Sequence, residues 1–330
     1  YVARDKIVFL KPDVITLDVE MPRMDGIEFL KKLLPQYPLP VVVVSAVTAE
    51  GSRRALEALE AGAIAVVAKP RAEDREGLQT MLSELADAIK EAARADVSKL
   101  RRRVVLATVK PRAPIVRGEG RVLAIGASTG GTTALNAIIR DFPPTMPGTV
   151  VVQHMPPVFT RMFAEALNKV SQVEVKEAQS GDEVAQGRVL IAPGDQHLRL
   201  VERGSSWVVA CVAGPKVSGH RPSVDVLFSS VASIAGDAAI GLLLTGMGRD
   251  GASGLLEMRK AGARCFAQDE ESSVVFGMPK EAWEMGAAER LVSLEGAVDE
   301  LLSCLAEPSP RSGVARSGVA RSGAARRNNR

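Results

Sequence analysis

Three side chains that could carry out acyl transfer follow apolar runs of the chain. Ser128 lies in the G-x-S-x-G segment 126–130, between an apolar run and a helical pattern. His154 directly follows a second apolar run, and Asp250 lies in the glycine-rich loop after a third. A serine nucleophile needs a base to take its proton and a carboxylate to orient that base. These residues therefore predict a serine hydrolase site, with the backbone N–H of Thr129 as a donor to the oxyanion.

Each of these assignments has a plainer alternative. The segment 126–130 could be a turn that packs or cradles a phosphate, and His154 could be a structural histidine. Other aspartates are less well placed than Asp250 to orient the base and could be cap or turn residues, namely Asp182, Asp195, Asp225, Asp237 and Asp269. The other histidines, His197 and His220, lie in polar or Gly/Pro-bearing surroundings typical of loops. The chain order Ser, His, Asp differs from the Ser, Asp, His of α/β-hydrolases, which argues against that fold. The case for a dinucleotide-binding site is weaker still, because the glycines of this segment do not form the pattern G-x-G-x-x-G.

The apolar runs around these residues alternate with helical patterns, which indicates a mostly parallel α/β sheet. Buried strands are expected at 122–125, 150–152, 189–192 and 240–244, further strands at 207–212 and 264–267, and helices at 132–140 and 161–170. In open α/β sheets the functional site lies at the carboxyl ends of the strands. Ser128, His154 and Asp250 should therefore meet at one edge of the sheet.

A smaller α/β pattern occupies the first seventy residues. Its apolar runs at 14–17, 41–44 and 65–68 end in Asp18, Ser45 and Lys69. These three side chains should also converge at the carboxyl ends of their strands, although an ordinary acidic loop is the plainer alternative. Apolar residues between 78 and 92 recur at helical spacing and predict an amphipathic helix that covers this sheet. The chain starts with Tyr1 inside a helical pattern, so we expect the natural N-terminus further upstream.

Composition excludes several classes of protein. Of the 330 residues, 46% are hydrophobic and 25% charged, as in soluble globular chains. The net charge is only +3 and its excess lies in the arginine-rich segment 311–330, so nucleic-acid binding is not expected. Membrane insertion is not expected either, because the chain has no apolar run of about 18 residues and no signal peptide. Cys211, Cys265 and Cys304 are odd in number and widely spaced, which fits a reducing, cytoplasmic compartment.

These patterns divide the chain into four parts. Residues 1–95 form the first α/β unit, 96–120 a linker, 121–306 the second and catalytic unit, and 307–330 a basic tail. The tail repeats Arg-Ser-Gly-Val-Ala, and we expect it to be disordered because Gly, Ser and Arg cannot build a core.

Four separated blocks of the second unit resemble the chemotaxis protein-glutamate methylesterase family. They are Gly-Ala-Ser-Thr-Gly-Gly at 126–131, Gln-His-Met at 153–155, Leu-Thr-Gly-Met-Gly-Arg-Asp-Gly at 244–251, and Ala-Gln-Asp-Glu at 267–270 followed by Val-Phe-Gly-Met-Pro at 275–279. The resemblance runs from about residue 122 to residue 305. Four blocks in one order make it highly specific.

This resemblance implies a doubly wound, mostly parallel α/β fold with Ser128, His154 and Asp250 as the catalytic triad. It places Met247 near the oxyanion and Thr129 beside the nucleophile. The implied reaction hydrolyses glutamate methyl esters on the cytoplasmic helices of methyl-accepting chemotaxis receptors and releases methanol, and members often deamidate receptor glutamines as well. No metal or organic cofactor is implied for this step. The remaining alternative is a non-catalytic response-regulator adaptor that binds receptors.

The first unit resembles the receiver domain of response regulators, through Asp-Val-Ile-Thr-Leu-Asp-Val-Glu-Met-Pro at 13–22 and Met-Asp-Gly at 24–26. The resemblance implies a flavodoxin-like fold and phosphorylation of Asp18 by the chemotaxis histidine kinase. Ser45 and Lys69 would supply a donor and a cation to the phosphoryl oxygens. In an intact parent, the receiver should obstruct the esterase site until it is phosphorylated.

We expect this receiver to be incomplete. The family's first strand supplies an acidic pair that binds Mg²⁺, and the chain begins too late to contain it, so Asp18 and Glu20 would be the remnant of the metal site. In a sheet of order 2-1-3-4-5, loss of the first two strands leaves the strand at 14–17 as an unpaired edge. Val66 also stands where the family usually has an aromatic switch residue. This half is therefore expected to be poorly stable and largely uncoupled from phosphorylation.

Overall fold

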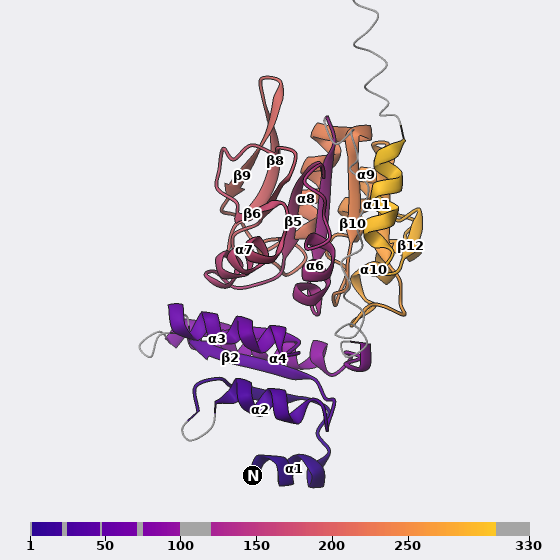
Figure 1. Ribbon diagram of the computed structural model, residues 1–330. Helices are drawn as coiled ribbons and strands as arrows, with labels where there is room; N and C mark the ends of the chain where they lie inside the picture. The colour runs from indigo at the N-terminus through magenta and orange to yellow at the C-terminus, as the bar shows by residue number, and fades with distance from the viewer. Residues whose placement is uncertain (1, 22–24, 47, 71–74, 100–119, 308–330) are drawn as a thin grey trace, which may run out of the picture.

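The computed structural model describes residues 2–21, 25–46, 48–70, 75–99 and 120–307 (Figure 1). These residues form two α/β units, one built on a three-stranded sheet and the other on a seven-stranded sheet. All but the first residue of the tail expected at 307–330, and most of the linker expected at 96–120, lie outside the described residues. None of the helices within the described ranges is both long and apolar enough to cross a bilayer.

The first unit is a parallel sheet with helices on both faces. Its elements are α1 (Val2–Leu10), β1 (Ile15–Asp18), α2 (Gly26–Leu33), β2 (Val41–Ala46), α3 (Ala49–Glu60), β3 (Ala65–Lys69) and α4 (Arg75–Ala92). The strand order is β1-β2-β3, and both pairs are parallel. Among the described strands β1 therefore pairs on one side only, as expected for an edge strand.

Alternation along β2 explains how this unit is layered. Val41 and Val43 are buried in the cluster that includes the apolar residues of α2 and α3. Val42 points to the opposite face and packs with residues of α4, because successive side chains of a strand alternate between faces. The spacing of apolar residues between 78 and 92 thus correctly predicted a helix that covers the sheet.

The second unit is a larger parallel sheet of strand order β12-β11-β10-β4-β5-β7-β6. Its elements are β4 (Val122–Ala127), α6 (Gly131–Ile139), β5 (Gly148–Gln153), α7 (Phe159–Val170), β6 (Glu174–Glu177), β7 (Arg188–Ile191), β8 (His197–Arg203), β9 (Ser206–Val212), α8 (Val224–Ala235), a 3-10 turn (Gly236–Ala238), β10 (Ala239–Leu243), α9 (Ala252–Lys260), β11 (Arg264–Gln268), α10 (Met278–Glu284), β12 (Arg290–Val292) and α11 (Ala297–Ala306). The chain leaves β4 toward β5 on one side and later returns as β10 on the other, which makes β4 the point where the winding reverses.

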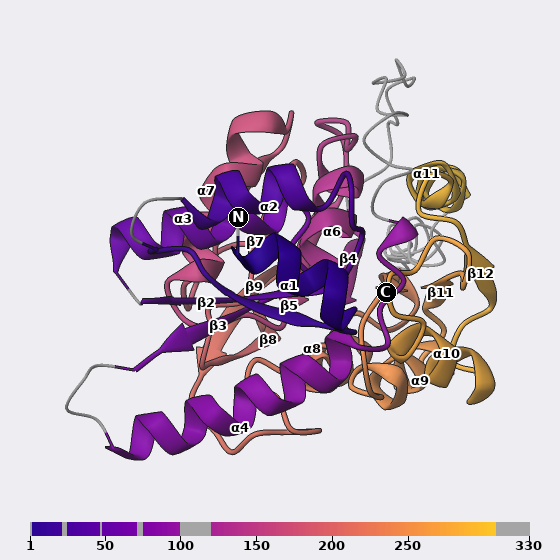
Figure 2. The same cartoon turned by 90° about the horizontal axis from the view of Figure 1, so that it is seen from below.

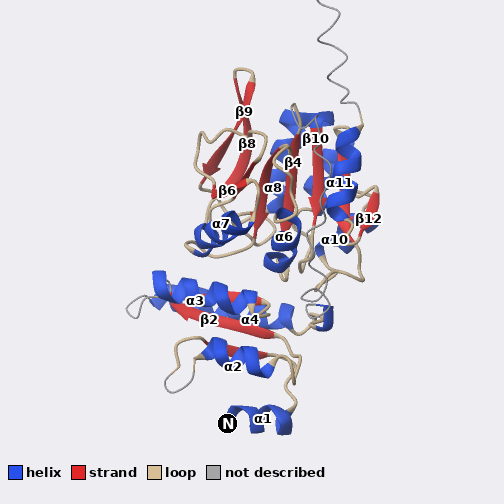
Figure 3. Ribbon diagram, in the orientation of Figure 1, coloured by secondary structure: helices blue, strands red, loops and turns tan. Residues whose placement is uncertain are grey.

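Both faces of the large sheet are buried under helices (Figure 3). Leu123 and Ile125 face α6, α7 and α11, whereas Val122 and Ala124 face α8, α9 and α10. This two-sided burial explains why the strands are nearly continuous apolar runs. The run at 207–212 was correctly expected to be a strand, but β9 pairs antiparallel with β8 in a separate hairpin and does not join the main sheet.

Two helices of the first unit, α3 and α4, contact the second unit. α3 packs against α7 and α6 of the second unit, and one apolar cluster continues across both units. α4 lies along the opposite face of the small sheet, and its C-terminal end reaches the second unit (Figure 2). The packing brings the end of a receiver-like helix to the edge where the predicted nucleophile lies.

Candidate active site

Three neighbouring strands bring the predicted nucleophile, base and orienter together. Ser128 follows β4, His154 follows β5 and Asp250 lies in the loop after β10, and these strands are adjacent in the order β10-β4-β5. His154 Nδ1 is 3.1 Å from Ser128 Oγ, and His154 Nε2 is 2.8 Å from Asp250 Oδ2. All three side chains are at least nine-tenths buried. The strand-end argument therefore located the residues that the fold assembles.

The histidine ring is oriented opposite to the common arrangement, in which Nε2 faces the serine and Nδ1 the aspartate. Here Nδ1 faces Ser128 and Nε2 faces Asp250. For His154 to accept the serine proton, its neutral ring must carry hydrogen on Nε2, donated to the carboxylate. Asp250 is placed to hold this tautomer.

Asp250 is bound by the N-terminus of α8. Its Oδ1 accepts hydrogen bonds from the hydroxyl of Ser223 at 2.8 Å and the N–H of Asp225 at 3.1 Å, and its Oδ2 accepts from the N–H of Val224 at 2.7 Å. Free N–H groups and the positive end of the dipole make a helix start a favourable place for an anion. The sequence analysis identified Asp250 but missed this helix terminus.

These contacts determine the charge of the carboxylate. Burial raises the pKa of Asp250, but hydrogen bonds from His154, Val224 and Ser223 and the charge of His154 outweigh burial and lower the pKa to about 2. Burial raises the pKa of the neighbouring Asp225, and the charge of Asp250 adds to that rise. Asp250 is therefore an anion throughout the neutral range.

The turn that carries Ser128 depends on close backbone packing. The Ser128 N–H donates to Thr245 O at 3.0 Å, and the Gly131 N–H donates to Ser128 O at 2.7 Å. Gly130 has φ +77°, and a Cβ there would lie 2.7 Å from Val274. Ser128 itself is not among the non-glycine residues of positive φ in the described chain, unlike the strained serine of a nucleophile elbow. The strand–turn–helix context was correctly predicted, but the unusual conformation belongs to Gly130.

Polar residues at other strand ends tie the loops of the site together. Gln153 Nε2 donates to Ser128 O at 2.9 Å. The Thr245 hydroxyl donates to Thr129 O at 3.0 Å and accepts from the Val275 N–H at 3.0 Å. Gln268 Oε1 accepts from the Thr245 N–H at 2.8 Å. Gln153 and Gln268 end their strands, and Thr245 follows β10 closely. The expectation that polar residues at the carboxyl ends of strands belong to the site could therefore have identified all three.

The two remaining histidines lie beside the site. His197 is the first residue of β8, so the expectation that it lies in a loop is wrong. Its Nε2 donates to Pro215 O at 2.8 Å and its Nδ1 accepts from the Ser223 N–H at 3.2 Å, which ties the segment before α8 to the hairpin. His220 lies in a turn, as expected, but its ring stacks on His154 with centroids 3.8 Å apart. The sequence offered no pattern that pairs His220 with His154.

The C-terminal end of α4 contacts the nucleophile turn. The Thr129 hydroxyl donates to Glu91 Oε2 at 2.7 Å, and Arg94 Nη1 is 3.5 Å from Met247 Sδ. The Asp96 N–H donates to Val274 O at 3.0 Å. Thr129 and Met247, the residues expected near the oxyanion, are thus both covered from the first unit. A cavity of about 590 Å³ beside this contact is lined in part by Arg94 and Met247.

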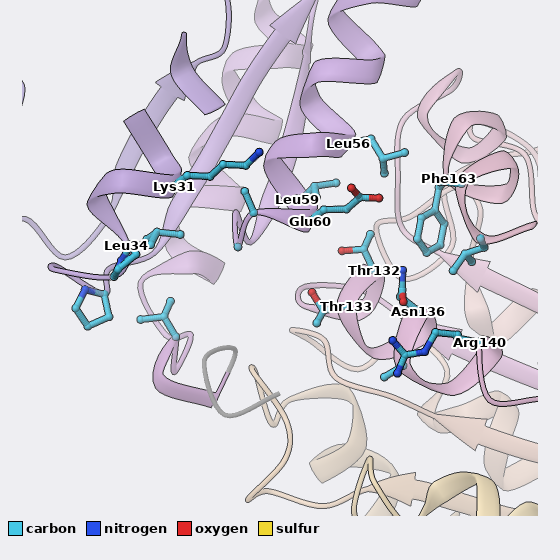
Figure 4. Close-up of a pocket in the computed structure, with 18 residues that line it drawn as sticks. Lys31, Leu34, Leu56, Leu59, Glu60, Thr132, Thr133, Asn136, Arg140 and Phe163 are labelled. Atoms are coloured by element: carbon cyan, nitrogen blue, oxygen red, sulfur yellow. The ribbon is translucent and has the colours of Figure 1, made fainter. Parts of the chain in front are cut away.

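A larger cavity of about 740 Å³ separates the two units away from the triad (Figure 4). Lys31, Leu34 and Glu60 line it from the first unit, and Asn136 and Phe163 from the second. No triad residue lines it. The interface therefore combines apolar packing with an unfilled space.

The receiver-like site is only partly assembled as expected. Lys69 Nζ and Asp18 Oδ2 form an ion pair at the ends of β3 and β1. Ser45 is fully buried and its hydroxyl donates to Gly51 O at 2.8 Å, so the structure does not direct it at Asp18. The expected convergence is therefore correct for Asp18 and Lys69. It is wrong for the Ser45 hydroxyl, because this hydroxyl donates its hydrogen bond to the backbone carbonyl of Gly51.

Asp18 and Glu20 are the acidic residues expected to remain from a magnesium site. Within the described ranges no group of three or more His, Cys, Asp and Glu side chains could hold a metal ion. Glu20 donates its N–H to Asp18 Oδ1 at 3.0 Å, and the second oxygen of Asp18 is paired with Lys69. The residues present do not by themselves make the oxygen-rich, octahedral site that Mg²⁺ requires, and we derive no step through that ion.

Comparison with known proteins agrees with the arrangement of the two units. Residues 123–301 match the family model for the CheB methylesterase, and residues 2–82 match that for the response regulator receiver domain. The chain belongs to the CheB methylesterase family. The family resemblance inferred from the four sequence blocks is thereby confirmed.

Relatives cover nearly the whole chain. A protein-glutamate methylesterase/protein-glutamine glutaminase of Syntrophotalea carbinolica is 55% identical over 93% of this chain and 88% of its own length. One from Sulfurimonas denitrificans is 50% identical over 93% of this chain and 89% of its own length. The solved catalytic domain of Thermotoga maritima CheB methylesterase is 39% identical, with a TM-score of 0.55, and covers 56% of this chain and 99% of that domain.

Proposed function

We propose that this chain is a serine-type protein-glutamate methylesterase that also deamidates glutamine side chains. The observation that carries the proposal is the continuous set of contacts from the Ser128 hydroxyl through His154 to Asp250. Relatives more than half identical to the chain bear the name of this activity. The proposed substrates are the cytoplasmic helices of methyl-accepting chemotaxis receptors, which places the protein in the cytoplasm.

The geometry supports a two-step acyl transfer. Ser128 Oγ attacks the ester carbonyl carbon while its proton passes to His154 Nδ1, and Asp250 stabilises the imidazolium through Nε2–H. His154 returns the proton to the leaving oxygen, methanol departs, and an acyl-enzyme remains. Water then hydrolyses the acyl-enzyme with His154 as base, giving glutamate and free Ser128. With a glutamine substrate, ammonia leaves in place of methanol.

The developing oxyanion needs donors near Ser128. In the described part of the chain neither the Thr129 N–H nor the Met247 N–H donates a hydrogen bond within the protein. Thr129 directly follows the nucleophile and precedes Gly130, the N-cap residue of α6. Gly246, next to Met247, packs closely against Ser128. We assign the two backbone N–H groups to the oxyanion, and side chains alone then account for every proton, so this step needs no cofactor.

The first unit supports regulation by phosphorylation. Asp18 is the proposed phosphoacceptor, the chemotaxis histidine kinase the proposed donor, and Lys69 the cation that faces the phosphoryl group. The contacts of Glu91 on α4 with Thr129 and of Arg94, just after α4, with Met247 support a proposed state in which the first unit obstructs the site. Phosphorylation would bias the packing of the two units toward exposure of the site.

Methanol release from methylated receptor membranes tests the enzymatic proposal. Ser128→Ala should abolish release, whereas Ser233→Ala, an exposed serine on α8, should leave it unchanged. A fluorophosphonate probe should label Ser128 and lose that labelling in His154→Ala, because the reaction needs an activated hydroxyl. Receptor binding without labelling or methanol release would favour the non-catalytic adaptor instead.

A further inference from the structure

The ring of His220 lies flat against the ring of the proposed base. The two centroids are 3.8 Å apart, and the ring planes differ by 9°. The contacts of His154 with Ser128 and Asp250 act at the edge of its ring, one at each nitrogen. They restrain the ring within its plane but resist tilting about the line between the nitrogens only weakly. A flat neighbour on one face blocks that tilt.

The backbone of His220 is anchored to the helix that holds Asp250. His220 closes a tight turn in which the Val217 N–H donates to His220 O at 3.0 Å and the His220 N–H donates to Val217 O at 2.9 Å. Ser218 and Gly219 between them have φ of +51° and +85°, as in the mirror-image turn of a β-hairpin. The Ser218 hydroxyl donates to Asp225 Oδ2 at 3.0 Å, in the first turn of α8. The stacked ring of His220 and the carboxylate of Asp250 are therefore both held by the N-terminus of α8.

His220 is uncharged under working conditions. Burial, and then the charge of His154, lower the pKa of His220 to about 4. The other groups that face it are Asp250 in the loop after β10, Lys216 on its own segment and Asp87 on α4. During catalysis His154 becomes an imidazolium, and a second cation 3.8 Å away would oppose that step. A neutral ring can remain stacked through the whole cycle.

We propose that His220 is a positioning residue that holds the imidazole plane of His154 between Ser128 and Asp250 by stacking as a neutral ring. The inference rests on the proposed function of the triad. It assigns His220 no proton transfer, so its aromatic shape and lack of charge are what matter.

Two substitutions separate shape from ring chemistry. His220→Ala removes the stacked surface, and kcat for methanol release should fall about 10- to 100-fold, the scale of a small misplacement of a catalytic group. KM should stay close to that of the parent chain, because His220 acts through the position of His154 in the chemical step and not through substrate binding. His220→Phe keeps a flat, uncharged ring and should restore most of the lost rate. In His220→Phe the acid limb of the pH profile of kcat/KM should stay at the same pH, since the pKa of His220 is lowered to about 4 and its ring does not titrate near neutral pH.

An unchanged kcat in His220→Ala overturns the inference. A loss that Phe does not rescue, or an acid limb that moves in His220→Phe, also overturns it, because either result assigns the effect to the ring nitrogens. The thermal midpoint of each variant shows whether any loss reflects unfolding. If His220→Ala is not folded at the assay temperature, His220→Leu, which also lacks a flat ring, replaces it, and His220→Tyr replaces an unfolded His220→Phe.

The rate of Ser128 labelling by a fluorophosphonate keeps this test independent of the natural substrate. If labelling slows in His220→Ala and recovers in His220→Phe while no receptor yields methanol, the positioning role stands and the proposed substrate fails. If methanol release requires Ser128 but neither rate responds to His220, the proposed function stands and the positioning role fails.

Discussion

Asp250 has more donors around it than a carboxylate needs in order to remain ionised. Four groups donate to its two oxygens, and its pKa of about 2 lies well below the neutral range. Such a carboxylate stabilises one tautomer of His154 as well as the imidazolium that forms during catalysis. The charge of Asp250 matters for the reaction, whereas its hydrogen bonds with Ser223, Val224 and Asp225 hold the start of α8.

Asp250→Asn tests this division. The amide fills the same space but can donate toward Nε2, which favours the tautomer that cannot accept the proton of Ser128. We expect kcat for methanol release to fall on the order of 10⁴-fold, the scale known for such a change in a serine protease triad. A loss below tenfold with an intact fold would contradict the assigned tautomer.

The pKa of His220 predicts a second effect, on stability. Its pKa is about 4 in the folded chain and near 6.5 when unfolded, so the unfolded state binds the extra proton between these values. The free energy of unfolding should therefore decrease as the pH falls from 6.5 toward 4, by up to about 3 kcal/mol. Urea unfolding of the parent chain at several pH values measures this slope. In His220→Phe this contribution should disappear.

Among the secondary-structure elements, the N-terminus of α8 links helix stability to catalysis. The Ser223 hydroxyl accepts from the Val226 N–H at 3.4 Å and donates to Asp250 at 2.8 Å. Ser223→Ala should cost about 1 kcal/mol of stability through the lost cap. It should also raise the pKa of Asp250 and lower kcat. Thermal unfolding and methanol release measure both effects, and Ser223→Thr, which keeps a hydroxyl, should retain more of each; equal losses in the two variants would argue against the cap.

The sequence predicted this edge of the sheet better than what surrounds it. Apolar strands with polar ends located Ser128, His154 and Asp250, because parallel strands align their carboxyl ends without further information. Ser223 followed by Asp225 is a recognisable helix start, yet no local pattern shows that this start faces Asp250. The sequence likewise predicted only that His220 lies in a loop. No local pattern shows that it stacks on His154, which lies 66 positions earlier in the chain. Strand β6 has the mostly polar sequence Glu-Val-Lys-Glu and β12 has only three residues, so neither carries an apolar run that would predict it.

At the scale of the whole molecule, the proposed obstruction of the site depends on a few polar contacts of α4. Glu91 holds the Thr129 hydroxyl, and Lys216 pairs with Glu84 across the interface at 3.4 Å. The 740 Å³ cavity leaves part of the contact between α3 and the second unit unfilled, although apolar packing continues beside it. Next to the nucleophile, the contact between the units therefore depends on a small number of polar side chains.

Glu91→Ala should raise basal methanol release without any phosphodonor. One hydrogen bond to a carboxylate contributes about 1 to 2 kcal/mol, so the rate should rise roughly five- to thirtyfold if opening limits it. Lys90→Ala, an exposed neighbour on α4, is the matched control and should leave the rate unchanged. Equal rates in the parent and Glu91→Ala would show that this contact does not hold the site closed.

The response to phosphorylation should be weak in this chain. Among the described residues no group of side chains around Asp18 could hold a magnesium ion, and Lys69 already pairs with the Asp18 carboxylate. Acetyl phosphate with Mg²⁺ should therefore change the esterase rate by less than about twofold, and Asp18→Asn should behave like the parent, because little phosphoryl transfer precedes the population shift. A large stimulation that Asp18→Asn removes would contradict this prediction.

The contact between Glu91 and Thr129 joins two parts of one chain, and this has a kinetic consequence. A tethered helix has an effective concentration set by the chain between the two units and not by the amount of protein present. Dilution therefore cannot relieve the obstruction. A receptor helix that needs the same turn competes with α4, so the obstruction should raise the apparent KM and leave kcat at saturating receptor close to that of the unobstructed enzyme.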